Sequence, residues 1–354
     1  MSGLVLGVDG GGTKSHYALA TAEGRLVDLV EGGAANHEVY DEGFPAAARE
    51  LGSSIRRLLE RNGASARELA ASVFGIAGAD VPSQAAAYRR VLAELGIGSP
   101  VVCNDAFLGV KAGTARGWGV CSINGTGTVA AAVDPAGRRI QIGGTGVISG
   151  DEAGAGHIAL MAARRAYDAL FRCGPPTALE GELLRFLGLG PGEEERFIEA
   201  IYERGLEAPA TVLGLARAVF SCAASGDAEA IGILENAGAQ MARSVAGAVR
   251  RLDFSGLPEV EVVVAGSVSL KGECPVLLDR FEAEARRLSP LPLAFLRLGA
   301  PPVLGALLWA LEEAGGAPGR RDGLAAELGA ALGRGHASAD APAGATAFDP
   351  GMTA

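Results

Sequence analysis

The chain has 354 residues, of which 49% are hydrophobic, and it carries a formal net charge of −10 at pH 7. This acidic balance argues against binding to nucleic acid polymers or to anionic membranes through bulk electrostatics. The length exceeds the usual size of one hydrophobic core, so we expect two domains.

Cysteine usage and apolar runs bound the class of protein further. The five cysteines are scattered and form no close pair, which is poor material for a disulfide framework or a zinc site. No apolar run reaches the roughly 18 residues of a membrane span, and the N-terminal segment is typical of a strand and unlike a signal peptide. We therefore expect a cytoplasmic protein. The cysteines are Cys103, Cys121, Cys173, Cys222 and Cys274.

The first part of the chain alternates predicted strands and helices. An apolar run at 4–8, a glycine-rich turn and a second apolar run at 17–20 predict a strand–turn–strand unit. Further strands are expected at Leu26–Gly32, Ser72–Ala77 and Pro100–Asn104, and helices at Pro45–Arg61, Gln84–Leu95 and Ala106–Ala115.

The first turn, Asp9–Lys14, has the chemistry of a phosphate-binding loop. Glycines allow a backbone to fold back and present bare N–H groups to phosphates, and a carboxylate at Asp9 suits the metal ion of ATP. A Walker loop or a dinucleotide fingerprint leads into a helix, whereas a strand follows here. The alternative is an ordinary Gly-Gly hairpin turn with no ligand.

A second strand–turn–strand unit begins near Trp118, about 115 residues after the first, with Gly125–Gly127 at its turn. The repetition predicts two α/β domains, 1–115 and 116–314, whose turns share one cleft, with the final helix of the second packing back on the first. The expected helices are Ile158–Phe171, Ala178–Phe186, Glu193–Arg204, Val212–Ala224, Asp227–Arg251, Pro275–Leu288 and Pro302–Glu313, with strands at Glu259–Ala265 and Leu293–Leu298.

The last segment, 315–354, is rich in Ala, Gly and Pro. Such a composition is typical of disorder, so we expect a largely disordered tail with at most a short helix near 324–332.

The ordered series of motifs resembles the superfamily of sugar kinases, actin and the heat-shock chaperones. Within it, the series is most similar to the BadF/BadG/BcrA/BcrD-type ATPases, which include N-acetylglucosamine kinases. The resemblance runs from Leu4 to about Leu311. It implies an α/β fold of two ribonuclease H-like (actin-like ATPase) domains with mixed sheets flanked by helices, facing across a nucleotide cleft. The motifs are Asp9–Lys14, Asn36–His37, Asn104–Asp105, Gly125–Thr128, Gly143–Gly156, Gly266–Ser269 and the helix near Gly305.

The resemblance also implies ATP and Mg²⁺ as cofactors, with Asp9 holding the magnesium ion through water. A backbone contact to the nucleotide is implied for Gly214, and contact with the adenosine for the loop after the strand ending at 265. The implied nucleotide-binding residues are Asp9, Gly11, Gly12, Thr13, Lys14, Gly125, Thr126, Gly127, Gly214, Gly266 and Ser267.

Asp105 is the candidate catalytic residue, because it ends a strand and begins a helix. A sugar hydroxyl is a weak nucleophile at neutral pH, and a carboxylate that accepts its proton orients and activates it. The alternative is an N-cap of the following helix. Turn chemistry for Asn36–His37 and a helix N-terminal carboxylate for Asp151 are further alternatives. The implied acceptor-binding residues are Asn36, His37, Gly78, Asn104, Asp105, Gly144, Thr145, Gly146, Asp151 and Ala155.

One stretch departs from the amino-sugar kinases. Residues 143–146 read Gly-Gly-Thr-Gly where those kinases commonly have Gly-Gly-Trp-Gly, and 153–157 read Ala-Gly-Ala-Gly-His in place of Gly-Ser-Gly-Tyr-Trp. The large aromatic residues that shape the sugar pocket are missing. ATP use is therefore better supported than any particular sugar.

The leading hypothesis is an ATP-dependent kinase that phosphorylates the 6-hydroxyl of an amino sugar such as N-acetylglucosamine or glucosamine. Another sugar (N-acetylmuramic acid, N-acetylmannosamine or glucose) is an alternative acceptor. An iron–sulfur activator of acyl-CoA dehydratases is disfavoured by the dispersed cysteines, and a sugar-sensing repressor by the absence of an N-terminal helix-turn-helix. Because kinases of this family are often dimers, we expect a homodimer with a small-molecule substrate and no nucleic-acid or membrane partner.

Overall fold

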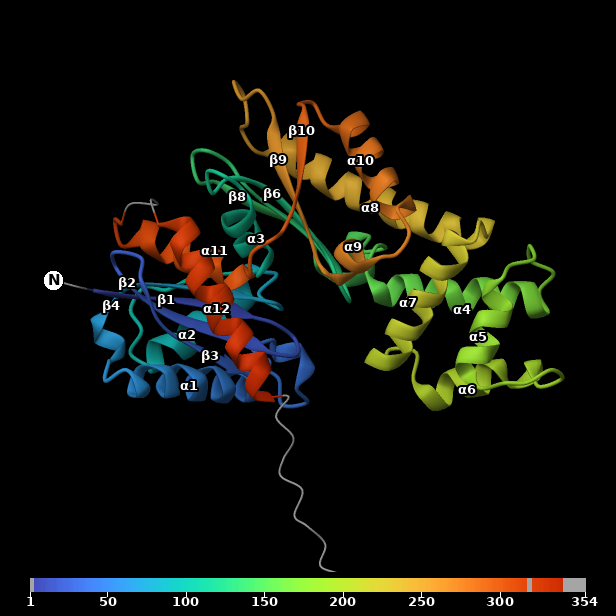
Figure 1. Ribbon diagram of the computed structural model, residues 1–354, viewed down its shortest axis with the longest axis horizontal. Helices are drawn as coiled ribbons and strands as arrows, with labels where there is room; N and C mark the ends of the chain where they lie inside the picture. The colour runs from blue at the N-terminus through green and yellow to red at the C-terminus, as the bar shows by residue number, and fades with distance from the viewer. Residues whose placement is uncertain (1–2, 317–319, 340–354) are drawn as a thin grey trace, which may run out of the picture.

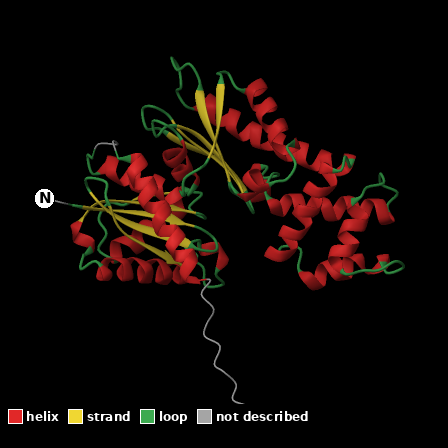
Figure 2. Ribbon diagram, viewed as in Figure 1, coloured by secondary structure: helices red, strands yellow, loops and turns green. Residues whose placement is uncertain are grey.

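The computed structural model describes residues 3–316 and 320–339 and contains two five-stranded mixed sheets (Figures 1 and 2). In the first sheet, β1, β2 and β3 form an antiparallel meander, and β4 and β5 run parallel to β1. The strand order is β3-β2-β1-β4-β5, with β1 at Leu4–Gly10, β2 at Ser15–Thr21, β3 at Leu26–Gly32, β4 at Leu69–Ile76 and β5 at Val101–Cys103.

The second sheet repeats this topology strand for strand. Its meander is β6-β7-β8, and β9 and β10 run parallel to β6. The order is β10-β9-β6-β7-β8, with β6 at Gly119–Asn124, β7 at Thr128–Val133, β8 at Arg139–Gly143, β9 at Val260–Ala265 and β10 at Leu293–Arg297. The predicted fold class, two α/β units with mixed sheets flanked by helices, is confirmed.

Helices α1 (Phe44–Arg61) and α2 (Pro82–Glu94) cover one face of the first sheet. In α1 the apolar residues Leu51, Ile55 and Leu58 recur at intervals of three and four, so they form one stripe along the helix. This stripe is buried together with Leu6 of β1 and Tyr17 of β2. The periodicity that predicted the helix therefore also fixes which side of it meets the sheet.

Two helices, α3 (Ala106–Gly113) and α11 (Pro302–Glu313), join the two sheets in one continuous core. Helix α3 packs on β6 and β7 of the second sheet, α11 packs on β1 and β4 of the first, and the two helices pack against each other. Glycine permits this approach, because a side chain at Gly305 would collide with the Leu108 backbone. Each helix thus covers the sheet of the other sequence half.

A mainly helical region lies between β8 and β10, is interrupted by β9, and forms its own core against the second sheet (Figure 1). The short helix α9 is the one α-helix of this region that the sequence patterns did not predict. No helix among the described residues combines the length and apolar character needed to cross a membrane. The helices are α4 at Ala155–Phe171, α5 at Leu179–Leu187, α6 at Phe197–Arg204, α7 at Pro209–Ala224, α8 at Ala228–Arg251, α9 at Ser267–Lys271 and α10 at Val276–Leu288.

The prediction of a largely disordered tail is wrong for residues 320–339, where α12 (Arg321–Ala339) packs beside β3. Leu324 and Leu328, one helical turn apart, are buried in the core that contains α11. The Glu327 carboxylate accepts a hydrogen bond from the Leu26 amide at 2.7 Å. In a segment rich in Ala and Gly, two leucines are a weak pattern for predicting a helix. They are enough to anchor α12 because the core around α11 offers them an apolar surface. Residues 317–319 and 340–354 of the predicted tail lie outside the described residues.

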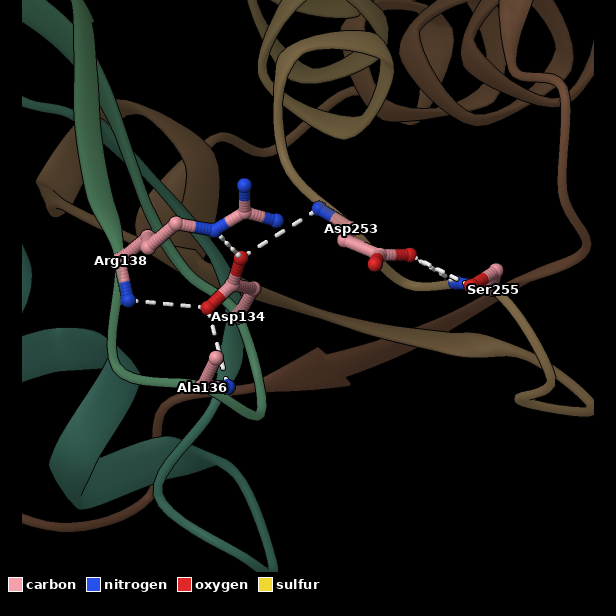
Figure 3. Close-up of polar contacts among 5 residues, drawn as sticks. All are labelled: Asp134, Ala136, Arg138, Asp253 and Ser255. Carbon is pink, nitrogen blue, oxygen red and sulfur yellow. Dashed lines mark hydrogen bonds and ion pairs between the residues drawn. The ribbon is translucent and has the colours of Figure 1, made fainter.

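A polar cluster fastens the β7–β8 turn to the segment after α8 (Figure 3). The buried Asp134 carboxylate accepts hydrogen bonds from the amides of Ala136 and Arg138 and from the Arg138 guanidinium, at 2.7–3.0 Å. The Asp253 amide also donates to it, at 3.4 Å. Burial alone would raise the pKa of Asp134, but the bonds from Arg138 and Asp253 outweigh it and lower the pKa.

A carboxyl whose pKa is lower in the folded than in the unfolded protein stabilises the fold above its unfolded pKa of about 3.9. We therefore expect Asp134→Asn to lower the free energy of unfolding at pH 7 by about 1–3 kcal/mol. The difference from the wild type shrinks as the pH falls toward 3. Urea denaturation at both pH values measures it.

The matched control is Asp253→Asn, because that carboxylate is exposed and, among the described residues, bonds only with the neighbouring Ser255. We expect this variant to stay close to the wild type. A loss in Asp134→Asn that is the same at pH 3 and pH 7 would contradict a role for the charge.

Candidate active site

Three carboxylates lie at, or just beyond, the carboxyl ends of three parallel strands of the first sheet. Asp9 in β1 lies in register with Gly75 of β4, which in turn lies in register with Cys103 of β5. Asp80 follows β4 and Asp105 follows β5. Carboxyl ends of parallel strands meet at one edge of a sheet, which is where α/β folds bind ligands. The topology thus brings the predicted base and the predicted metal-binding residue to the same edge.

The first glycine turn is folded tightly and presents its tip to solvent. The Gly11 amide donates to the Lys14 carbonyl at 3.1 Å, and the amides of Ala35 and Asn36 donate to the Gly11 carbonyl. A side chain at Gly11 would come within 2.7 Å of the Lys14 carbonyl oxygen, so glycine is required there. Gly12 and Thr13 at the tip are exposed. The predicted phosphate loop has the shape and exposure that the prediction requires.

Asp9 lies at one end of a series of polar side chains that continues through His16 and Glu31 to Lys14. Its carboxylate lies 3.8 Å from His16 Nδ1, and His16 Nε2 lies 3.4 Å from Glu31. Lys14 forms an ion pair with Glu31 at 3.0 Å. The nucleotide contact predicted for Lys14 therefore requires the lysine to leave Glu31 or to share it.

Asn36, His37 and Gly78 lie together beside the first turn. The Asn36 side chain accepts a hydrogen bond from the Glu38 amide at 2.9 Å, and His37 stacks on Phe44 with ring centroids 3.8 Å apart. Gly78 packs so closely that a side chain there would collide with the Asn36 amide group. Asn36 therefore has the turn role that the sequence left open, and the acceptor role stays a prediction.

Asp105 does not cap the helix that it precedes. Its carboxylate makes no capping hydrogen bond, and the first turn of α3 is instead capped by Asn104, whose Oδ1 accepts from the Ala106 amide at 2.9 Å. Burial and the negative charges of Asp9 and Asp80 raise the pKa of Asp105 to about 7. The alternative of a structural N-cap is thereby removed, and the carboxylate is left available as a proton acceptor near neutral pH.

The sequence analysis missed Asp80 and Gln141. Asp80 Oδ1 accepts hydrogen bonds from Asn104 Nδ2 and from Gln141 Nε2, each at 2.8 Å. Asp80 follows a buried strand just as Asp105 does, so its position was a usable signal. Gln141 had none, because its part in the site depends on the placement of β8 opposite the first sheet.

The second turn, Gly125–Gly127, is held by the start of α4. The Gly125 amide donates to the Gly127 carbonyl at 3.0 Å. The amides of Ala155 and Gly156 donate to the carbonyls of Gly125 and Thr126, at 2.8 and 3.1 Å. Thr126 and Gly127 stay exposed. Ala155, predicted to bind the acceptor, therefore lies beside the second glycine turn.

The glycine-rich loop between β8 and α4 is fastened by Asp151. The Asp151 carboxylate accepts from the Gly146 amide at 2.6 Å and lies against Gly143, where a side chain would collide with it. Asp151 precedes α4 by four residues, and the N-cap of α4 is Gly154; the Asp151 carboxylate instead accepts from the first amide of the short 3₁₀ helix Gly146–Ser149. Its acceptor role stays a prediction. The tip beyond Gly146 is apolar and open, since Val147 is 98% and Ile148 92% exposed.

A cavity of about 400 Å³ lies between the starts of α4 and α9 and one side of α7. Ser267 and Ala155 line it, as do Arg217 and Lys271. This size suits a nucleoside, and the cavity adjoins the second turn through Ala155.

Two predicted glycines have different surroundings. Gly266, at a φ of +89°, approaches the backbone of Asn124 so closely that no side chain fits. It therefore fixes, beside the second turn, the loop that is predicted to contact adenosine. Gly214 lies within α7 and faces the Phe186 ring, which accounts for the glycine by helix packing. Its nucleotide contact stays a prediction.

The donor set fits a magnesium ion that is held mainly by phosphates and water. Within the described residues, no three His, Cys, Asp or Glu side chains converge as a metal site. Mg²⁺ in nucleotide enzymes is commonly bound by one or two carboxylates together with substrate phosphates. The partly exposed Asp9 carboxylate beside the first turn meets that requirement.

Known proteins share this fold. A crystal structure from Chromobacterium violaceum, described as a candidate N-acetylglucosamine kinase, superimposes with a TM-score of 0.62 at 24% identity, covering 87% of this chain and 99% of that one. A second such structure, from Porphyromonas gingivalis, has a TM-score of 0.56 at 18% identity, covering 87% and 98%.

Sequence similarity to known proteins shows the family of this chain. An N-acetylmuramic acid/N-acetylglucosamine kinase of Clostridium acetobutylicum is 31% identical over 265 residues, which are 75% of this chain and 85% of that protein. Residues 6–310 match the sequence profile of a single ATPase family. The chain therefore belongs to the BadF/BadG/BcrA/BcrD ATPase family, as its motifs predicted.

Proposed function

We propose that this protein is an ATP-dependent carbohydrate kinase that transfers the γ-phosphoryl group of ATP to the 6-hydroxyl of an amino sugar. The observation that carries the proposal is the uncapped Asp105 carboxylate, at the same sheet edge as the first glycine turn. The family and the curated relative support the kinase class, and the relative's acceptors support an amino sugar.

In this proposal the nucleotide lies between the two turns. Backbone N–H groups at the tips of Gly11–Lys14 and Gly125–Gly127 donate to phosphate oxygens. The adenosine occupies the cavity lined by Ser267. Asp9 holds the magnesium ion, which neutralises phosphate charge when it is bound.

Asp105 acts as the general base. Its carboxylate accepts the proton of the attacking hydroxyl and orients the oxygen toward the phosphoryl group. Phosphoryl transfer has a loose transition state, so positioning supplies much of the rate, and the base supplies one part of it. A pKa of about 7 keeps a large fraction of Asp105 ionised at neutral pH while leaving it basic enough to take the proton.

The acceptor contacts polar groups at this edge, among them Asn36, Asn104 and Asp151. These side chains offer both donors and acceptors to sugar hydroxyls. N-Acetylglucosamine and glucosamine are the proposed acceptors. A homodimer in the cytoplasm remains our expectation from the family resemblance.

The dehydratase-activator alternative requires thiols that can meet around a cluster shared by two subunits. Of the five cysteines, Cys103, Cys121, Cys222 and Cys274 are buried and only Cys173 is exposed. This distribution favours the kinase.

An ADP-release assay with a panel of sugars tests the function. We expect Mg²⁺-dependent ADP release to be stimulated by N-acetylglucosamine or glucosamine more than by N-acetylmuramic acid, N-acetylmannosamine or glucose. Stimulation mainly by one of the latter three would correct the acceptor. ADP release that no sugar stimulates would refute the proposal.

Asp105→Asn tests the base. We expect turnover to fall by roughly 10²–10⁴, because the amide cannot accept the proton. Nucleotide affinity, measured by calorimetry, should stay within about twofold, because Asp105 makes no part of either turn or of the Ser267 cavity. Turnover near that of the wild type would remove Asp105 from the role of base.

The same variant has a stability signature of its own. Because the pKa of Asp105 is raised in the fold, ionisation above pH 7 destabilises the native protein relative to the unfolded chain. We expect Asp105→Asn to raise the Tm at pH 8, on the order of 1–3 °C, with no gain at pH 4. Asp134→Asn is the control of opposite sign, since the pKa of Asp134 is lowered. A lower Tm of Asp105→Asn at pH 8 would contradict the electrostatic strain at this edge.

A further inference from the structure

We propose that Asp80 is a positioning residue that joins the two lobes at the acceptor site, where the first lobe is the unit built on the first sheet and the second lobe is the unit built on the second sheet. One carboxylate oxygen of Asp80 holds both Asn104 of the first lobe and Gln141 of the second. The proposal rests on the proposed function for its kinetic consequences. The structural claim, that Asp80 connects the two lobes, rests only on the hydrogen bonds of Asp80 with Asn104 and Gln141.

In the first lobe, Asp80 and Asn104 fix each other. Asn104 is buried, and its two amide atoms have different partners: Oδ1 accepts from the Ala106 amide and Nδ2 donates to Asp80. The loop of Asp80 is itself fixed, because its amide donates to Gln84 of α2 at 2.9 Å. The orientation of Asn104, and with it the first turn of α3 next to Asp105, thus depends on Asp80.

From the second lobe, Gln141 of β8 reaches the same oxygen. Its Nε2 donates to Asp80 Oδ1 at 2.8 Å and also approaches the Gly143 carbonyl at 3.1 Å. Gly144 packs against this pair, and a side chain there would come within 2.8 Å of the Gln141 amide and 3.1 Å of Asp80. The contact therefore ties the glycine-rich loop of one lobe to the Asp105 edge of the other.

The second oxygen of Asp80 has no hydrogen-bond partner among the described residues, and the side chain is partly exposed. Asp80 and Asp9 are the charged groups that face Asp105. Removing the Gln141 bond therefore disturbs the relative position of the lobes, whereas neutralising Asp80 changes the charge near Asp105. These two effects are separable by mutation.

Gln141→Leu removes the donor from the second lobe, nearly preserves side-chain size and leaves the Asp80 charge in place. We expect kcat/KM for the sugar to fall about 5–20-fold, with KM for ATP within about twofold of the wild type. Gln240→Leu is the matched control, because the partners of Gln240 in the described part of the chain all belong to its own lobe. A Gln141→Leu enzyme that matches the control in sugar kcat/KM would overturn the kinetic part.

Asp80→Asn keeps an acceptor oxygen for both donors and removes the charge. We expect the acid limb of its kcat–pH profile to move to lower pH, because Asp105 loses a negative neighbour. Asp80→Ala loses both features and should combine the pH shift with the loss in sugar kcat/KM. An unchanged pH profile in Asp80→Asn together with full activity in Asp80→Ala would exclude a positioning role.

Hydrogen exchange tests the structural part without turnover. We expect amides in 78–82 and 139–146 to exchange faster in Gln141→Leu than in the wild type, and to be unchanged in Gln240→Leu. Equal exchange in all three proteins would refute the interlobe contact. A wild type that no sugar stimulates refutes the proposed function instead, and the exchange comparison still decides the role of Asp80.

Discussion

The close approach of α3 and α11 is the constraint on which the arrangement of this molecule depends. Each helix packs on the sheet of the opposite sequence half, and glycine at Gly305 lets them meet backbone to backbone. A second close contact, Gly7 of β1 against α11, places the first sheet at a fixed depth. Because interiors are packed as densely as crystals, such contacts transmit small shifts instead of absorbing them. The position of Asp105, at the first turn of α3, is therefore set by the joint between the lobes as much as by its own strand.

This arrangement brings carboxylates together at one edge of the sheet, which is electrostatically unfavourable. Three parallel strands end at one edge, and each is followed by or contains a carboxylate: Asp9, Asp80 and Asp105. Burial and the negative charges of Asp9 and Asp80 raise the pKa of Asp105. Burial and the charges of Glu38 and Asp151 raise the pKa of Asp80, and the hydrogen bonds from Gln141 and Asn104 oppose that rise only in part. Active sites commonly keep such strain, which the surrounding fold stabilises. Here one of the hydrogen bonds that oppose the rise, the bond from Gln141, also connects the lobes.

Local patterns predicted most of the fold. Strands, long helices, the duplicated strand–turn–strand unit and both glycine turns follow from periodicity and turn chemistry, which act over a few residues. Sequence patterns did not predict the features that depend on packing between distant parts of the chain. The helix α12 depends on an apolar surface supplied by α11 and the first sheet, and Gln141 enters the site only through the register of β8. Asp80 is the intermediate case, because like Asp105 it follows a strand of the first sheet, but it does not itself begin a helix. Gly214 shows the converse, since helix packing against Phe186 explains a glycine that the family motif assigned to the nucleotide.

Under the proposed function, the missing pocket aromatics would change how the acceptor is selected. Where amino-sugar kinases commonly present a tryptophan, this chain has Thr145, and the neighbouring loop is held by the Asp151 carboxylate through a backbone amide. The remaining acceptor-side groups are amides and carboxylates, such as Asn104 and Asp80, that are already joined in hydrogen bonds. A site that recognises hydroxyls with buried polar groups rejects a sugar lacking one of them strongly, because the unpaired group is left without a partner. An apolar wall discriminates far less between sugars that differ by a methyl or acyl group. For the proposed kinase we therefore expect strict recognition of the hydroxyl pattern and tolerance toward the substituent on the sugar nitrogen.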